Sequence, residues 1–199
     1  MFAAPLAARL EGRIVVLEPI ADVHEEGLWQ AAQDPAIWQW THAVVGASRD
    51  AYDEWYGQAR AEQEAGVSAP FAIRSASSGE LVGSSRYMSL RPEHRGLEIG
   101  HTWMNSSTWN TGANAETKFL LLEHAFEDAG CMRVEFKTDA KNERARRALE
   151  ALPTRFEGIF RKHMLVRGDE LRDSAWYAIT DDEWPEVRAA LRARLDRKR

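Results

Sequence analysis

Cysteine is nearly absent from this 199-residue sequence, which contains only Cys131. A single cysteine excludes an internal disulfide framework and favours a reducing compartment. Positive charge is also scarce, because 26 lysines and arginines are outnumbered by 31 aspartates and glutamates, for a formal net charge of −5. This balance disfavours a nucleic-acid partner, since a phosphate backbone is bound by an excess of basic side chains.

Long apolar runs are missing as well. No uninterrupted apolar segment approaches the ~20 residues that a membrane-spanning helix needs. Residues 2–8 are mostly apolar, but Arg9 and Glu11 end the run, and its basic residue follows it, whereas a signal peptide carries basic residues in front. We therefore expect a soluble, cytoplasmic protein with no membrane partner.

The motifs of several enzyme classes are not found. There is no G-x-G-x-x-G fingerprint and no G-x-S-x-G elbow, and Gly112 with Lys118 is a poor match to a P-loop. The six histidines show no zinc-ligand spacing, so we expect no metal site. The acidic run 181–183 fits a helix start better than a pair of catalytic carboxylates.

What the sequence does contain is an ordered series of strand and helix patterns. Apolar and β-branched runs predict strands at 13–20, 70–75, 81–90, 95–104, 131–137, 155–166 and 171–179. Helical periodicity predicts helices that begin at 22 and 181 and that span 49–66, 113–130 and 139–153. This order favours one mixed α/β (α+β) domain over 1–199, with a flexible segment at 1–10 and a C-terminal helix at 181–199.

Three local patterns make sharper predictions. Asp22 is the expected N-cap of the first helix, with Glu25 at capping-box spacing. Alternation gives the strand 95–104 two faces, one with Leu97, Ile99, His101 and Trp103 and the other with Glu98, Gly100 and Thr102. The helix after it has an apolar stripe of Ala115, Phe119, Leu122, Phe126 and Ala129, with Glu116, Glu123 and Glu127 pointing away.

Between that strand and that helix lies WNTGAN, from Trp109 to Asn114. The N-terminus of a helix has unpaired amides and a partial positive charge, so small residues there let a phosphate approach the backbone. An ordinary Asn or Thr cap explains the same residues, and for this segment alone it is the simpler interpretation.

The order of the segments resembles the GCN5-related N-acetyltransferase (GNAT) superfamily, and specifically its RimJ/RimL-like branch. The resemblance runs from about 10 to 195 and rests on WNTGAN, on NAETKFLLLEHAFEDAGCMRVEFKTDAKNERARRALE and on EGIFRKHMLVRGDELRDSAWYAI. It implies a GNAT fold, with a mixed central sheet of about seven strands, flanked by helices, in which the fourth and fifth strands splay apart.

The same resemblance implies transfer of an acetyl group from acetyl-CoA to a primary amine, by direct attack in a ternary complex and without a metal. Pyrophosphate binding falls on Trp109, Asn110, Thr111, Gly112, Ala113, Asn114 and Ala115. Of these, Gly112 matches the family loop, while Trp109 replaces a Gln or Arg and Asn114 replaces a small residue. Backbone groups near Trp103 and Met104 would hold the pantetheine. Asn142 matches a cofactor-contacting asparagine and is also an expected N-cap.

Glu98 is the candidate general base, directly or through water, because related enzymes often place a glutamate on this strand and Gly100 beside it leaves room for a substrate. The alternative is an exposed strand glutamate. His101 is a chemical rival, but alternation turns it inward unless a β-bulge re-aims it. The general acid stays open, since the helix 139–153 has no tyrosine and carries Ala145 where related enzymes often have a serine.

The acceptor site is the least defined part. The segment IWQWTHA supplies Trp38, Trp40 and His42, and Arg86 and Tyr87 could face the same cleft, although aromatic residues more often pack in a core. The acceptor is either a protein N-terminal amine or a small-molecule amine. A non-catalytic acyl-CoA-binding regulatory module is the alternative, motivated by Asn114 and the missing tyrosine. A homodimer through the Trp-rich face is compatible with both.

Overall fold

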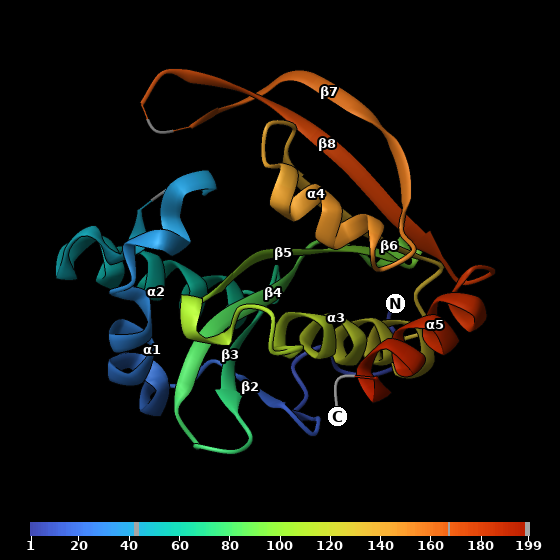
Figure 1. The fold of residues 1–199 in the computed structure, drawn as a ribbon, viewed down its shortest axis with the longest axis horizontal. Coiled ribbons are helices and arrows are strands. Elements are labelled where there is room, and N and C mark those ends of the chain that lie inside the picture. Colours follow the sequence, from blue (N-terminus) through green and yellow to red (C-terminus); the bar gives the residue numbers. More distant parts are fainter. Residues whose placement is uncertain (42–43, 167, 198–199) are drawn as a thin grey trace.

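A computed structural model describes residues 1–41, 44–166 and 168–197. In this part of the chain, eight strands form one sheet in the order β1–β2–β3–β4–β5–β6–β8–β7 (Figure 1). The strands are β1 (Leu10–Glu11), β2 (Val15–Pro19), β3 (Ala69–Ser75), β4 (Leu81–Arg91), β5 (Gly96–Met104), β6 (Arg133–Asp139), β7 (Arg155–Val166) and β8 (Glu170–Thr180). The predicted mixed sheet is confirmed; the eighth strand is the two-residue β1, which pairs with β2.

Helices cover both faces of the sheet. The α-helices are α1 (Glu25–Ala32), α2 (Arg49–Glu64), α3 (Ala113–Glu123), α4 (Glu143–Glu150) and α5 (Trp184–Asp196). One apolar cluster joins the sheet to α3 and α5, and a second joins it to α1 and α2. Figure 1 shows the two pairs of helices at separate sides of the molecule. Because helices lie on both sides, β4 and β5 contribute side chains to two different interiors.

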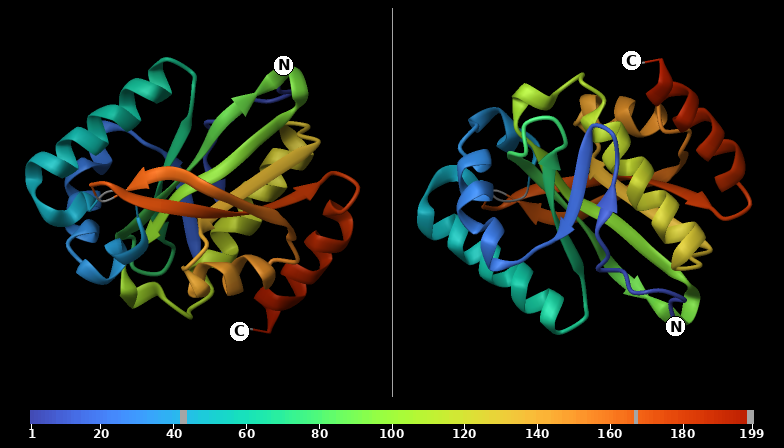
Figure 2. Two further views of the ribbon diagram at one scale, coloured as in Figure 1. Left: turned by 90° about the horizontal axis from the view of Figure 1, so that it is seen from above. Right: turned by 90° about the horizontal axis from the view of Figure 1, so that it is seen from below.

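The sheet is strongly twisted, so β7 and β8 run across the direction of β3 and β4 (Figure 2). All neighbouring strands are antiparallel except β5 and β6, which run parallel. A parallel pair needs a crossover connection, and here α3 supplies it. The connection places the N-terminus of α3 next to the end of β5.

Helix α3 and the π-helical turn after it (His124–Asp128) bury the predicted apolar stripe, but not every polar residue points away. Phe119, Leu122 and Phe126 are buried as expected. Glu116 was expected to point away from the core, and this is wrong: it is 5 % exposed and accepts hydrogen bonds from the backbone amides of Ile14 (2.5 Å) and Val15 (2.8 Å). The carboxylate satisfies two amides at the start of β2, which explains how it tolerates burial.

Two further local predictions are wrong. The Asp22 side chain caps no helix; it accepts a hydrogen bond from Arg60 Nη1 at 2.6 Å, and Asp22 opens a short 3-10 turn (Asp22–His24) ahead of α1. The strand predicted at 131–137 starts two residues too early, because Cys131 and Met132 precede β6. A flexible segment was expected at 1–10. In the structure this segment makes contacts with the rest of the chain, such as the hydrogen bond of 3.0 Å from the Ala3 amide to the Ala129 carbonyl.

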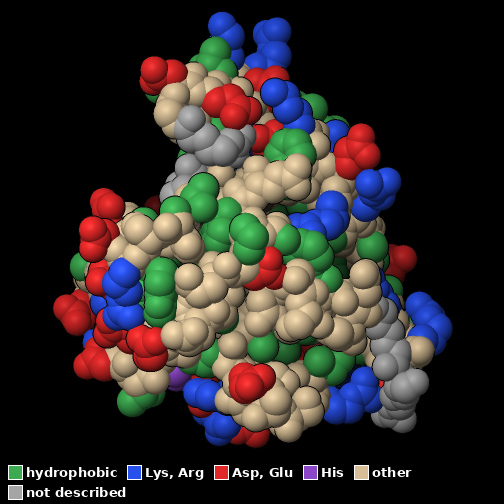
Figure 3. Space-filling model, turned by 60° about the vertical axis from the view of Figure 1, so that its left-hand side comes forward, with side chains coloured by type: hydrophobic (Ala, Val, Ile, Leu, Met, Phe, Trp, Pro, Cys, Tyr) green, Lys and Arg blue, Asp and Glu red, His purple; other side chains and the backbone are tan. Residues whose placement is uncertain are grey.

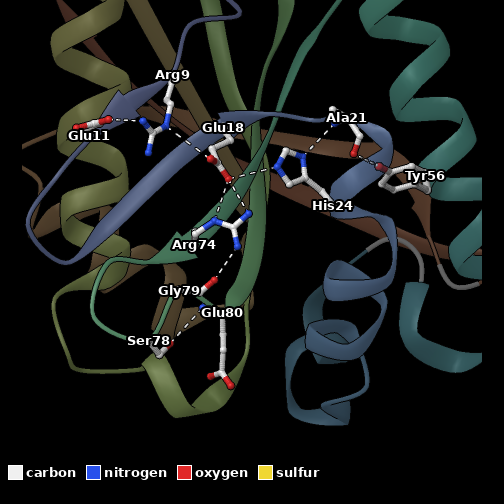
Figure 4. A network of polar contacts seen from close by, with 10 residues as sticks. All are labelled: Arg9, Glu11, Glu18, Ala21, His24, Tyr56, Arg74, Ser78, Gly79 and Glu80. Atoms are coloured by element: carbon white, nitrogen blue, oxygen red, sulfur yellow. Dashed lines mark hydrogen bonds and ion pairs between the residues drawn. The ribbon is translucent and has the colours of Figure 1, made fainter.

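A polar network ties β2 and β3 to the turn before α1 (Figure 4). Glu18 at its centre accepts from Arg74 Nε at 3.0 Å and from His24 Nε2 at 3.2 Å. The His24 ring is buried, and its Nδ1 accepts from the Ala21 amide at 3.1 Å. Tyr56 of α2 donates to the Ala21 carbonyl at 2.7 Å, which holds α2 against the same turn.

Candidate active site

The parallel pair β5–β6 comes apart part-way along its length. Paired residues run only from Gly96 with Arg133 to Glu98 with Glu135, although β5 continues to Met104 and β6 to Asp139. The two strands therefore diverge beyond Glu98. A gap inside a sheet leaves backbone groups of both strands unpaired by the ladder, so it suits a ligand that can supply hydrogen bonds.

A β-bulge re-aims the second half of β5. Ser84 of β4 pairs with Trp103, but Arg86 pairs with Gly100. An advance of two residues on β4 is therefore matched by three residues on β5, which means that β5 contains one extra residue. Within this bulge, His101 has a φ of 48°. The predicted single face with Ile99 and Trp103 is wrong: Ile99 packs in the cluster under α3, and Trp103 packs in the cluster with α1 and α2. The extra residue in the bulge switches the alternation.

A cavity of about 520 Å³ occupies the region of this gap. Most of the predicted site residues line it, namely Trp38, Trp40, Glu98, Trp103, Met104, Trp109, Asn110, Gly112, Asn114, Ala115 and Asn142. Thr111 and Ala113 face a separate hollow beside β2. His42 lies outside the described residues. Figure 3 shows hydrophobic side chains across the middle of the face on which α1 and α2 lie, with charged side chains mainly around its margin.

The N-terminus of α3 forms one wall of the cavity. Gly112 is its N-cap with a φ of 101°, a left-handed conformation that favours glycine. No side chain caps the helix at Gly112, and the Ala113 amide donates to Thr111 Oγ1 at 3.2 Å. Trp109 lies just before this turn, where its Nε1 donates to the Met104 carbonyl at 3.2 Å. The Arg144 guanidinium carbon lies 3.9 Å from the centre of the Trp109 ring, which brings a positive charge from α4 to the same wall.

Asn142 begins α4 as predicted. Its Oδ1 accepts from the Ala145 amide at 3.0 Å, and the residue is buried while lining the cavity. The N-cap role and a position at the cavity wall therefore occur together in Asn142. Ala145 lines the cavity too, and α4 has no tyrosine.

Glu98 lies at the point where β5 and β6 diverge. It is 2 % exposed, and its Oε2 accepts from Lys137 Nζ at 2.9 Å and from Ser89 Oγ at 3.3 Å. Its cross-strand partner on β4 is Met88, so both side chains lie on one face of the sheet. The space that was expected beside Gly100 for a substrate is occupied by Met88, since a Cβ on residue 100 would lie 2.6 Å from Met88 Sδ.

Lys118 is a lining residue that was not predicted. It is 6 % exposed, and its Nζ donates to Thr102 Oγ1 at 2.5 Å and lies 5.5 Å from the centre of the Phe136 ring. Burial lowers the pKa of Lys118 to about 7, although the attraction of Glu98 opposes that shift. The sequence did carry a signal: Lys118 lies between Ala115 and Phe119 on the buried side of α3, where a lysine is unusual.

Tryptophans build the wall opposite α3. The ring centres of Trp38 and Trp103 are 5.3 Å apart, and those of Trp55 and Trp103 are 5.7 Å apart. Trp38 is 4 % exposed and donates from Nε1 to the Ala32 carbonyl at 2.9 Å, which are the features of a packed core residue. Trp40 is only half-buried and also lines the cavity.

Arg86 and Tyr87 lie away from this cavity. Arg86 points to α2, where its Nη1 donates to Glu62 Oε2 at 2.8 Å, and Tyr87 points to α3, where its hydroxyl donates to the Leu121 carbonyl at 2.6 Å. Burial lowers the pKa of Arg86 against the attraction of Glu62, and burial raises the pKa of Tyr87. Helices cover both faces of β4, which is why neither side chain reaches the cleft.

The described residues contain neither a metal-binding cluster nor a membrane-spanning helix. No group of three or more His, Cys, Asp or Glu side chains there is placed to hold a metal ion. None of the described helices combines the length and apolar character needed to cross a bilayer.

Known proteins share this architecture. A sequence family described as "Acetyltransferase (GNAT) domain" matches residues 15–153. A crystal structure of a GCN5-related N-acetyltransferase from Brucella melitensis is 31 % identical, with a TM-score of 0.88, and the match covers 96 % of this chain and 86 % of that one. Mycobacterium smegmatis RimJ, solved in complex with CoA-disulfide, is 24 % identical, with a TM-score of 0.74 over 94 % of this chain and 93 % of that one. This second likeness is one of fold.

A curated relative adds to these matches. The uncharacterized N-acetyltransferase YnaD of Bacillus subtilis (strain 168) is 29 % identical over 104 residues, or 52 % of this chain. The match spans 59 % of that relative's length. The family match and the solved structures cover the strands that diverge and the helix between them. The chain therefore belongs to the GNAT family of acetyltransferases.

Proposed function

We propose that the protein transfers the acetyl group of acetyl-CoA to a primary amine by direct attack, with both substrates bound together. One observation supports this above all: the β5–β6 pairing stops at Glu98, and a single cavity there is lined by the N-terminus of α3 and by Glu98 itself. The cavity of about 520 Å³ is within the size range of small-ligand sites.

The donor side would be the wall formed by α3 and α4. Backbone amides at the N-terminus of α3, reached past Gly112, suit the pyrophosphate of coenzyme A. Arg144, stacked on Trp109, adds a positive charge. Asn142 and the backbone near Met104 line the path into the gap and would contact the pantetheine.

The reaction asks two things of this chain: removal of a proton from the acceptor amine and stabilisation of the negative charge that develops on the carbonyl oxygen. A primary amine is protonated at neutral pH and must lose a proton before its nitrogen can attack. Glu98 would take that proton, directly or through water, and its contacts with Lys137 and Ser89 hold the carboxylate in place. Backbone donors of the diverging strands would stabilise the negative charge that develops on the carbonyl oxygen.

The acceptor would be a protein N-terminal amine or a small-molecule amine. The apolar wall with Ile37, Trp40 and Met88 favours an amine that carries an apolar group beside the nitrogen. Acceptors differ widely among proteins that share a fold, so N-terminal peptides and small amines both belong in the test.

A non-catalytic acyl-CoA-binding module is the second candidate. It is favoured by the absence of a tyrosine from α4, where Ala145 lines the cavity. Such a module would bind acetyl-CoA through the wall formed by α3 and α4 and would release no thiol.

Thiol release separates the two candidates. The protein is incubated with acetyl-CoA and a panel of N-terminal peptides and small amines, while acetyl-CoA binding is measured by calorimetry. Acceptor-dependent thiol release supports the transferase, and tight binding without turnover across the panel supports the module. Absence of binding contradicts both. Size-exclusion chromatography on the same sample tests for a homodimer.

A further inference from the structure

Lys118 is a buried ionisable group at the cavity that the proposed reaction has not used. A lysine is rarely buried without a partner of opposite charge, because taking its charge out of water is costly. Within the described ranges no carboxylate oxygen lies within 4.0 Å of Lys118 Nζ, and its one hydrogen bond is to the neutral hydroxyl of Thr102. A solvent-exposed position would avoid this cost, so the burial calls for an explanation other than stability.

The position of Lys118 relates it to the gap. Its Nζ contacts Thr102 of β5 and lies over the ring of Phe136 of β6, so it bridges the two strands that diverge. Lys118 also belongs to α3, five residues after the helix begins at Ala113, or about 7.5 Å along the axis. A donor substrate held at the start of α3 and inserted between β5 and β6 would pass this amine.

Glu98 and Lys118 reach the gap from opposite faces of the sheet. Glu98 shares its face with Met88 and Arg86, and Arg86 contacts α2. Lys118 comes from α3 on the other face. One face thus offers a group that can take a proton from the acceptor, and the other face offers a group that can give one.

We propose that Lys118 donates a proton to the sulfur of coenzyme A when the thioester bond breaks. This inference rests on the proposed function. The acceptor nitrogen bonds to the acetyl carbon, the carbon–sulfur bond breaks with its electron pair on sulfur, and the Lys118 Nζ proton passes to that sulfur. The acceptor ammonium loses one proton to Glu98 or water before attack and a second from its nitrogen after the new bond forms. One of these replaces the proton that Lys118 gives and the other passes to solvent, so the products are the amide, the thiol and one proton.

The acid strength of Lys118 agrees with this role. Its pKa of about 7 lies below the value of about 8.5 for an ordinary thiol, so the transfer runs downhill. The other ionisable side chains that line the cavity are Glu98, His101, Lys137, Arg144, Arg172 and Arg194. Lys137 is already ion-paired with Glu98, and arginine stays protonated at working pH, so neither is a matched donor.

Two substitutions test the proposal. Lys118→Met keeps the length of the side chain without an ionisable group, and Lys118→Gln keeps a possible hydrogen bond to Thr102 without a proton to give. We expect both to retain acetyl-CoA affinity by calorimetry and to lose about 10²-fold in kcat for thiol release. The control is Lys162→Met, at an exposed lysine of β7, with wild-type kcat expected.

The pH profile gives a second readout. A proton donor must be protonated, so kcat of the wild type should fall as pH rises through about 7, and the residual kcat of Lys118→Met should lack this fall. Three results would overturn the role of Lys118 as proton donor. They are wild-type kcat in either Lys118 variant, the same fall of kcat with rising pH in Lys118→Met, and loss of acetyl-CoA affinity together with kcat. Acetylation of Lys118 itself, detected as a protein mass increased by one acetyl group, would also overturn the proposal, because Lys118 would then act as a nucleophile. No turnover in the wild type overturns the proposed function itself.

Discussion

At the scale of single residues, Glu98 combines near-complete burial with an ion pair to Lys137 at the mouth of the gap. Glu98→Gln keeps the shape of the side chain but removes the group that would take the acceptor's proton. We expect kcat to fall by about 10²–10⁴-fold, with acetyl-CoA affinity unchanged. Steady-state thiol release and calorimetry measure the two quantities. Glu93→Gln, at an exposed glutamate, is the control, and full turnover in Glu98→Gln would remove Glu98 from the mechanism.

Trp38 and Trp40 are two residues apart and differ in burial. Trp38 is 4 % exposed and packed against Trp103, so Trp38→Ala should lower the free energy of unfolding by about 3–5 kcal/mol in urea titrations. Trp40 is half-buried at the cavity, so Trp40→Ala should leave stability nearly unchanged and raise the acceptor KM. A folded Trp40→Ala protein with an unchanged acceptor KM would assign Trp40 to packing.

At the scale of elements, the start of α3 depends on the left-handed conformation of Gly112. Alanine in that conformation costs roughly 1–2 kcal/mol. In Gly112→Ala we expect the turn to shift and acetyl-CoA affinity to fall by about tenfold, which corresponds to 1.4 kcal/mol. Gly66→Ala is the matched control, because Gly66 also has a positive φ (68°), has open space around a Cβ and lies outside the cavity. Equal loss of acetyl-CoA affinity in both variants would contradict a cradle at Gly112.

The elements were largely predictable because each follows a periodic pattern. The stripe of Ala115, Phe119 and Leu122 defines α3, and the alternation of Val134 and Phe136 defines β6. The faces of β5 were predictable only as far as Ile99. The bulge at His101 switches them, and simple alternation carries no signal for an inserted residue.

The site was predictable where it depends on order along the chain. Gly112 and Asn142 lie at the starts of α3 and α4, Glu98 lies where the β5–β6 pairing ends, and all three line the cavity. Arg86 could not be placed in the same way, because its partner Glu62 is 24 residues away on α2, a contact that only the packing of α2 creates. Lys118 was not predicted, because the expected buried side of α3 was defined by its apolar residues alone.

At the scale of the whole molecule, stability should depend on pH through His24 and Glu18. Burial lowers the pKa of His24 below 6.5 despite the attraction of Glu18, and protonation at Nδ1 would break the bond from the Ala21 amide. The folded protein therefore favours neutral His24, so this stability is present above pH 6.5 and is lost as pH falls through the folded pKa. Burial raises the pKa of Glu18, but Arg74 and His24 outweigh it and lower the value, which adds acid sensitivity below 4.5.

Urea midpoints between pH 7.5 and 5.5 test this dependence. His24→Asn can keep an acceptor for the Ala21 amide but does not titrate, so its midpoint should fall less with acid than that of the wild type. His94→Asn, at an exposed histidine, should follow the wild type. Identical acid sensitivity in His24→Asn and the wild type would assign the effect to other groups.

The divergence of β5 from β6 gives the sheet an edge in its interior. Backbone amides on the open sides of the two strands are left to water, whereas Gly96–Glu98 and Arg133–Glu135 are locked in the ladder. The β5-facing amides of 136–139 and the β6-facing amides of 99–104 should therefore exchange faster with solvent hydrogen than the locked residues in the free protein, and acetyl-CoA should slow them selectively. A ligand that fills the gap between β5 and β6 would take the place of a strand there. Its binding would then be measured as slower hydrogen exchange of backbone amides at the centre of the sheet.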